Sequence, residues 1–114
     1  MKWTSLAAIV VALAPTVAHA LYLEGNDLHR DCAMPEKTAQ GQYCLAYVTG
    51  VFDTIDAFRQ VQKTKPMICA PVQATPGQIV DVVREYLNEH PEKRHMAAVV
   101  LVGAALQNAF PCGE

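Results

Sequence analysis

The stretch HMAAVVLVGAALQNAF, residues 95–110, contains eleven consecutive apolar residues at positions 96–106. As a helix, these residues would rise about 16 Å, whereas the hydrocarbon core of a bilayer is about 30 Å thick. The run is therefore too short to span a membrane, and it has no polar face that would suit a helix lying on a membrane surface. It predicts the central helix of a small bundle, or a helix that lies half in the core and half in a subunit interface.

Small side chains are frequent in this run, which contains four alanines and Gly103. Neighbouring helices could therefore approach it closely on several sides, and we expect it to be intolerant of charge. Val100→Asp would then bury an unpaired carboxylate at a cost of several kcal/mol. That cost is a large share of a total stability of roughly 5–10 kcal/mol.

The N-terminus carries a second apolar segment, LAAIVVALA at residues 6–14, which follows the positive charge of Lys2. Pro15 comes next, and the sequence Ala18-His19-Ala20 places small residues at the −3 and −1 positions of a cleavage site. This arrangement is typical of a secretory signal peptide. We therefore expect residues 1–20 to be removed and residues 21–114 to form one exported domain.

The exported domain is slightly acidic and rich in cysteine for its size. The 114-residue chain has a formal net charge of −2, and the loss of Lys2 makes it −3. Since no basic patch is present, nucleic acid and anionic membranes are poor candidates for its partner. A domain this short is marginal on core burial alone. An even number of cysteines in an exported chain predicts two disulfides among Cys32, Cys44, Cys69 and Cys112.

The apolar pattern predicts an all-α protein, a small compact bundle of about four helices. A short helix is expected at residues 25–32 and a longer one at residues 41–61. The longer helix has apolar or small residues at helical spacing, which we expect to face the core: Tyr43, Tyr47, Gly50 or Val51, Thr54, Phe58 and Val61. Because a glycine costs about 1 kcal/mol within a helix relative to alanine, we expect Gly50 to lie at a close contact between helices.

The third helix begins with a clear start signal. Thr75 suits the N-cap position, Pro76 suits the first helical position, and Gln78 completes a capping box. Pro91 ends this helix and can begin the next one, because its missing N–H is no loss in a first turn. The apolar stripe of the third helix consists of Ile79, Val82, Val83, Tyr86 and Leu87.

The pairing of the four cysteines follows if the third and fourth helices form an antiparallel hairpin. The start of one helix then lies beside the end of the other, which brings Cys69 close to Cys112. Cys32 and Cys44 would then close the connection between the first two helices. Of the three connectivities that four cysteines allow, we therefore expect Cys32–Cys44 and Cys69–Cys112.

Catalytic and metal-binding patterns are not found in the sequence. His90 and His95 lack the His-Glu-x-x-His spacing of zinc proteases, and Pro91 interrupts any shared helix. Cysteines that are oxidised in pairs leave no thiol nucleophile, and Asp53 and Asp56 are typical of a solvated helix face. We therefore expect no catalytic residue, no metal site and no cofactor. The sequence points to a protein that acts by binding.

Four segments occur in a distinctive order: CLAYVTGVFD (44–53), ICAP (68–71), TPGQIVDVVREYLNEHPEKRHMAA (75–98) and AFPC (109–112). In order and spacing they resemble the Rap/Tai family, the immunity proteins for amidase effectors of type VI secretion. The likeness covers residues 25–112, nearly the whole exported domain. Ala46 stands where a glycine is expected in the usual Cys-Leu-Gly-Tyr, a change that we expect to affect packing only.

The resemblance implies a compact, helical, often dimeric periplasmic protein. Such a protein would insert a helix and a loop into the cleft of a secreted peptidoglycan amidase, and so protect the producing cell and its kin. The partner is then a protein, with a homodimer as a further possibility, and neither nucleic acid nor membrane is bound after signal cleavage. An inhibitor of this kind needs only a rigid surface, and disulfides reduce the entropic cost of binding.

We expect the contact surface to include the turn between the third and fourth helices. Loops held on rigid scaffolds commonly carry binding function, and Pro91 stiffens this one. An ordinary solvated connection is the alternative reading for any one of its residues. The candidate partner-binding residues are Asn88, His90, Glu92, Lys93, Arg94 and His95.

Two other classes of function stay open at this point. A periplasmic holdase, a chaperone-like protein with no amidase partner, would bind clients after acid had loosened its fold. An enzyme, such as a lipid or peptide hydrolase, would depend on His29, His90 or His95.

Overall fold

The computed structural model describes residues 23–113, so the expected signal peptide at residues 1–20 lies outside the described residues. Its α-helices are α1 (Gly25–Cys32), α2 (Ala39–Gln62), α3 (Pro76–Glu89) and α4 (Ala98–Ala109), with a 3-10 turn, η1 (Pro91–Lys93), between the last two. The described residues contain no strand beyond an isolated antiparallel bridge between Glu24 and Ala97. The prediction of an all-α bundle of four helices is confirmed.

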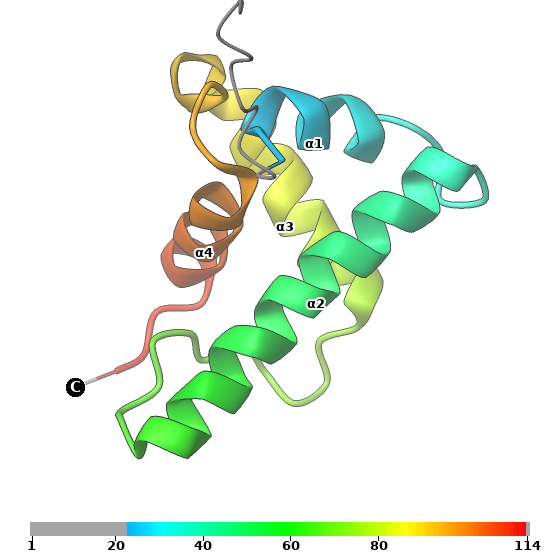
Figure 1. Ribbon diagram of the computed structural model, residues 1–114. Coiled ribbons are helices and arrows are strands. Elements are labelled where there is room, and N and C mark those ends of the chain that lie inside the picture. The colour runs from blue at the N-terminus through cyan, green and yellow to red at the C-terminus, as the bar shows by residue number, and fades with distance from the viewer. Residues whose placement is uncertain (1–22, 114) are drawn as a thin grey trace, which may run out of the picture.

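The helices form a compact bundle around one core (Figure 1). The long helix α2 crosses the molecule from end to end, α1 lies over one end, and α4 runs back antiparallel to α3. Within residues 23–113, no helix is long and apolar enough to cross a bilayer.

Helix α3 begins as the sequence predicted. The Thr75 hydroxyl accepts a hydrogen bond from the backbone N–H of Gln78 at 3.2 Å, and the Gln78 side-chain oxygen accepts one from the N–H of Thr75 at 2.8 Å. This reciprocal pair satisfies two N–H groups that the first turn leaves without helical partners. Behind it, the predicted stripe is buried at Ile79, Val83 and Leu87 and half-buried at its other two positions.

Helix α4 is buried along one side only. Its core residues are Ala98, Leu101, Val102, Ala105 and Leu106. Val99 and Val100 are 44% and 51% exposed, so the expectation that Val100 is buried is wrong. In a helix, only residues three or four positions apart lie on the same side. A continuous apolar run therefore places some of its residues in the core and the residues between them on the outside.

The fourth helix also starts later than Pro91, where we expected it. Pro91 begins only the 3-10 turn, and residues 94–97 are held instead by backbone hydrogen bonds to the chain just before and within α1. The N–H groups of Gly25 and Asn26 donate to the carbonyls of Met96 and Arg94, each at 2.8 Å, and the N–H of Ala98 donates to Leu23 at 2.7 Å. Because the backbone of residues 94–97 is held in this pairing, α4 begins at Ala98 and not at Pro91.

Helix α2 covers nearly the expected residues, but only part of the predicted stripe faces the core: Tyr47 and Val51 are half-buried and pack against it. Tyr43, Phe58 and Val61, from the stripe predicted to face the core, are 48%, 64% and 76% exposed. Gly50 faces open space, since a Cβ added there would have no neighbouring atom within 4 Å. The expected contact at Gly50 is therefore absent within the described chain. The core side of α2 overlaps the predicted stripe at Val51 and consists of Gly41, Cys44, Leu45, Val48, Val51, Phe52 and Ile55.

The disulfides explain why this stripe faces inward. Cys32–Cys44 and Cys69–Cys112 form as predicted, with Cα–Cα distances of 5.1 and 5.0 Å. Cys32 and Cys44 are both buried in the core. Because Cys44 must point at α1 to make its bond, it fixes the rotation of α2 about its own axis.

The two faces of α4 predict opposite responses to the same substitution. Val102→Asp places a carboxylate at a position that is 0% exposed, and we expect it to lower the free energy of unfolding by several kcal/mol. Val100→Asp, two residues away and half exposed, should change it by less than about 1 kcal/mol. Urea denaturation followed by circular dichroism measures both. Equal loss of stability in the two variants would contradict this orientation of α4.

Candidate functional site

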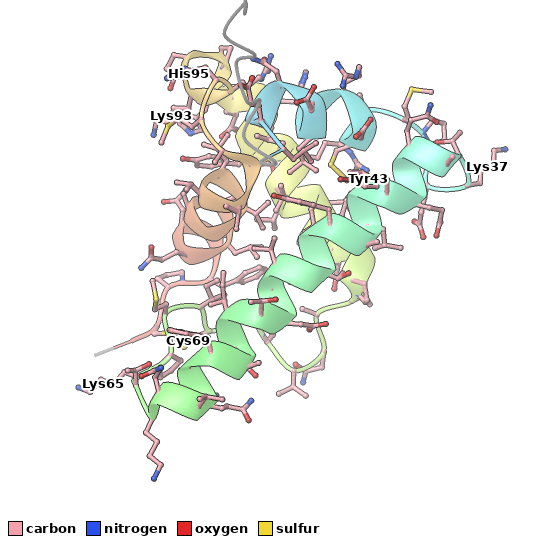
Figure 2. The ribbon with its side chains drawn as sticks, in the orientation of Figure 1. Lys37, Tyr43, Lys65, Cys69, Lys93 and His95 are labelled. Atoms are coloured by element: carbon pink, nitrogen blue, oxygen red, sulfur yellow. A yellow bond between two sulfur atoms is a disulfide. The ribbon has the colours of Figure 1, made fainter. Side chains whose placement is uncertain are left out.

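The six predicted partner-binding residues lie together at one end of the bundle, around the turn that joins α3 to α4. Figure 2 shows Lys93 and His95 at this end, far from Lys65, which lies just beyond the C-terminal end of α2. The turn is closed by its own backbone: the N–H of Lys93 donates to the His90 carbonyl at 3.1 Å, and the N–H of Met96 donates to the Lys93 carbonyl at 2.9 Å. The side chains of the turn therefore project from a backbone with internal hydrogen bonds.

Arg94 holds this turn onto the end of α3. Its Nε donates to the Leu87 carbonyl at 2.6 Å, and an Nη donates to the Asn88 carbonyl at 3.3 Å. The last carbonyls of a helix lack helical partners, and a cation near them also interacts favourably with the helix dipole. The guanidinium is thus occupied inside the protein, which gives Arg94 a structural role whatever else it contacts.

Asn88 is also bound within the molecule. Its side-chain oxygen lies 2.8 Å from Nε2 of His29, which places the two side chains in a hydrogen bond between α3 and α1. From the sequence, we had named His29 only as a residue on which an enzyme would depend. Its pairing with Asn88 depends on the tertiary fold, because 59 positions separate the two residues.

His90 and Glu92 form a local pair on the outside of the turn. The His90 ring packs against Tyr86 with ring centroids 4.3 Å apart, and its Nδ1 lies 3.1 Å from a Glu92 carboxylate oxygen. The backbone N–H of Glu92 itself and then the His90 side chain hold the pKa of the Glu92 carboxyl below its usual value. Glu92 is therefore a carboxylate at neutral pH, already hydrogen-bonded by its own neighbours.

Lys93 and His95 are the predicted residues that are least committed to other parts of the chain. The Lys93 ammonium lies 5.8 Å from the centre of the Tyr86 ring and 3.5 Å from its hydroxyl. Among residues 23–113, no carboxylate lies within salt-bridge distance of it. His95 is exposed. Lys93 is therefore the cation of this surface that can pair with a group from outside.

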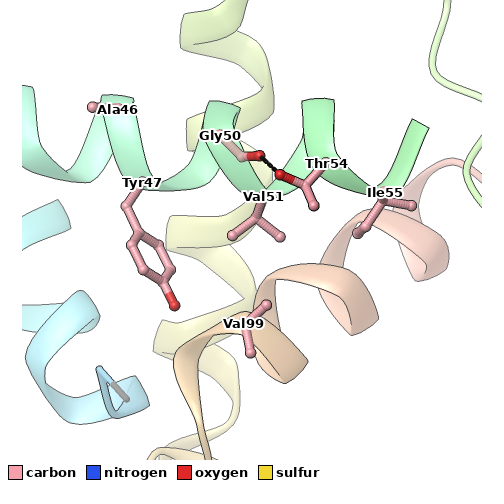
Figure 3. Close-up of a pocket in the computed structure, with 7 residues that line it drawn as sticks. All are labelled: Ala46, Tyr47, Gly50, Val51, Thr54, Ile55 and Val99. Carbon is pink, nitrogen blue, oxygen red and sulfur yellow. Dashed lines mark hydrogen bonds between the residues drawn. The ribbon is translucent and has the colours of Figure 1, made fainter. Parts of the chain in front are cut away.

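A second candidate surface lies between α2 and α4, where we had expected Tyr47, Val51 and Thr54 to be part of the core. An apolar groove of about 430 Å³ runs between α2 and the start of α4 (Figure 3). Its α2 side includes the small residues Ala46, Gly50 and Thr54, and Val99 contributes from α4. Tyr47, Val51 and Ile55 also line it. The Tyr47 ring stacks on that of Tyr43 with centroids 6.2 Å apart, and partial burial raises the pKa of the Tyr47 hydroxyl.

Neither surface has the groups of a metal centre. Within residues 23–113, no three His, Cys, Asp or Glu side chains are placed so that they could hold a metal ion together. Both surfaces instead offer what protein recognition uses: one has charged and hydrogen-bonding side chains on a rigid turn, and the other has an open apolar face.

Comparison with known families identifies the chain. A family model described as Rap1a immunity proteins matches residues 24–112, which include all four helices and both disulfides. The chain belongs to this family. No match was found among curated proteins or among solved structures.

Membership in the Rap1a family confirms the resemblance on which the sequence analysis relied. An immunity protein acts on a toxic protein made to damage cells, so membership implies an effector protein as partner. The residues that this Rap1a family member uses to bind it are a separate question. The fold reduces the number of candidates, because Arg94 and Asn88 are hydrogen-bonded to other parts of the chain, whereas Lys93 makes a long hydrogen bond of 3.5 Å to Tyr86 and His95 is exposed.

The structure predicts that Arg94 and His95, although adjacent, contribute differently. Arg94→Ala leaves carbonyls at the end of α3 without their charged donor, and we expect it to lower the free energy of unfolding by about 2 kcal/mol. His95→Ala removes an exposed side chain and should change it by no more than about 0.5 kcal/mol. Chemical denaturation of both variants tests the assignment. If they are equally stable, Arg94 does not fix the turn.

Proposed function

We propose that this protein is a periplasmic immunity protein that binds and occludes a peptidoglycan amidase effector delivered by type VI secretion. It would thereby protect the producing cell and its kin, without being an enzyme itself. Membership in the Rap1a immunity family supports a protein partner. The observation that carries the proposal is the α3–η1–α4 end, where His90, Glu92, Lys93 and His95 stand on a turn fixed by Arg94.

Occlusion requires rigidity more than chemistry. A surface that blocks an amidase cleft must lose little conformational entropy when it docks, because only the surplus of contact energy appears as affinity. At this end, Pro91 fixes one backbone torsion of the turn. Arg94 ties it to α3, and residues 94–98 are hydrogen-bonded to residues 23–26. The surface is thus pre-formed before any partner arrives.

Co-expression tests this function directly. Candidate type VI amidases from the same genome are exported to the periplasm with or without this protein, and cells that carry the wild type should survive at least one of them. Lys93→Glu/His95→Glu should abolish protection, because it reverses the charge at Lys93, which has no carboxylate partner within residues 23–113, and adds a negative charge at the exposed His95. Arg94 is left unchanged, since its loss would disturb the fold.

The matched control is Lys37→Glu/Lys65→Glu, which introduces two acidic residues at exposed positions away from the turn. It should protect as well as the wild type, and both variants should show the wild-type thermal midpoint. Full protection by Lys93→Glu/His95→Glu would remove the turn from the contact surface. Failure of the wild type to protect against every amidase would refute the proposed function.

We further propose that the apolar face of α2 is the surface of a homodimer. Large exposed apolar residues are unusual on a monomer when they form one face, and here Tyr43, Phe58 and Val61 line the same side of α2 as Gly50. An open glycine lets two helices approach closely, and a two-fold interface must match its own copy. Two α2 helices that cross antiparallel at Gly50 would meet this condition, because aromatic residues lie on both sides of it.

Gly50→Arg should separate such a dimer without harming the subunit, because Gly50 is exposed and a Cβ at this position meets no atom within 4 Å. Sedimentation velocity should show the wild type as a dimer at micromolar concentration and Gly50→Arg as a monomer. Gln60→Arg, also exposed on α2, should remain a dimer. A monomeric wild type would refute the dimer. If that monomer suppressed the aggregation of denatured proteins at acid pH, the result would support the holdase alternative, with the apolar face of α2 as the surface that binds clients.

A further inference from the structure

A polar groove of about 510 Å³ lies between the end of α3, η1 and the outer side of α4. Three of its residues follow each other at helical spacing across α3 and η1, and three follow at helical spacing on α4. They are Tyr86, His90, Lys93, Ala104, Gln107 and Asn108. The short side chain of Ala104 leaves the space that the longer ones surround. The groove is therefore built by two segments that the turn brings together, and it adjoins the candidate partner surface.

The groups around this groove are mainly hydrogen-bond donors. Lys93 contributes an ammonium group that has no carboxylate partner within residues 23–113. The Tyr86 hydroxyl accepts from Lys93 at 3.5 Å, so its own hydrogen stays free to donate. Gln107 and Asn108 add exposed side-chain amides. The nearby Glu92 carboxylate lies beyond salt-bridge distance of Lys93, although attraction between the two charges helps to hold the pKa of Glu92 below its usual value.

We propose that this groove receives the carboxylate of a glutamate or aspartate side chain from the protein partner. A carboxylate offers about four lone-pair sites and no donor, which matches an ammonium, a hydroxyl and two amides. Hydrogen bonds between an ammonium and a carboxylate are about twice as strong as those between neutral groups. Tyr86 behind Lys93 restrains the ammonium and lets the lysine stem cover an aromatic ring.

The chemistry of the groove also separates this ligand from others. Phosphate-rich polymers need several cations, and the groove has one, on a chain with a net charge of −2. A purely apolar side chain would strip water from Lys93, Gln107 and Asn108 and give them no partner, which is costly. A single carboxylate satisfies the groups that are present. This inference rests on the proposed function for the identity of the partner, but the groove can be tested without that partner.

The test uses two short peptides as probes, acetyl-Gly-Glu-Gly-amide and the same peptide with glutamine. Each is titrated into the full exported domain labelled with ¹⁵N, and amide chemical shifts are followed. The glutamate peptide should give saturable shifts at Lys93, Gln107 and Asn108. The glutamine peptide should bind at least about fivefold more weakly, because it lacks the charge-assisted bond.

Two variants and one control complete the test. Lys93→Gln and Gln107→Glu should each weaken binding of the glutamate peptide at least about fivefold, the first by removing the cation and the second by adding a competing anion. Lys65→Gln changes an exposed lysine just beyond the C-terminal end of α2, far from the groove, and should leave binding unchanged. The NMR spectra also show whether each variant is folded. If Lys93→Gln were unfolded, the result for Gln107→Glu, a change at an exposed position, would decide whether the groove binds the carboxylate.

The inference is overturned if the glutamate peptide causes no saturable shifts in the groove. It is also overturned if both peptides bind equally, or if Gln107→Glu binds as the wild type does. Its failure is distinguishable from failure of the proposed function. Peptide binding without protection from any amidase would leave the groove assigned and the immunity proposal refuted, and protection without peptide binding would do the reverse.

Discussion

The backbone pairing of residues 23–26 with residues 94–98 is the constraint on which the rest of the structure depends. No side chain caps the first N–H groups of α4. The backbone carbonyl of Leu23, a residue just before α1, accepts the hydrogen bond of one of them. The approach is so close that a Cβ on Gly25 would collide with Leu101 and with the Arg94 backbone. These hydrogen bonds thus fix where α1 begins and where α4 begins, and they hold the turn between α3 and α4 against α1. The candidate binding surface owes its rigidity to this pairing.

Features encoded by neighbouring residues were predictable from the sequence. The capping box of Thr75 and Gln78 involves residues three apart, so it could be read before the fold was known. The disulfides followed from the hairpin of α3 and α4, since only two helices had to be placed. The buried face of α2 was predicted only in part, because this helix carries two overlapping apolar stripes and periodicity alone does not rank them. The pairing of Cys44 with Cys32 held the missing information, since a cysteine bonded to α1 must face the core.

The candidate site shows a similar division. The sequence located the turn, because proline and charged residues mark it, but it did not separate side chains that support the turn from those that are free. Arg94 and Lys93 are adjacent and both basic, yet Arg94 donates to α3 carbonyls while Lys93 lies over Tyr86. The polar groove was invisible for the same reason. Gln107 and Asn108 line the same groove as Lys93 only because α4 folds back along α3.

Helix α4 finally shows why a run of small apolar residues without a polar face is useful in a protein of this size. Its buried side contributes alanine, leucine and valine to the core, one flank lines the apolar groove with Val99, and another opens the polar groove at Ala104. Larger residues at the outer positions would fill both grooves, and a conventional polar outer face would remove the apolar one. A domain with four helices has few faces to spare for binding. Because α4 is narrow, the same helix can complete the core and still leave room on two sides.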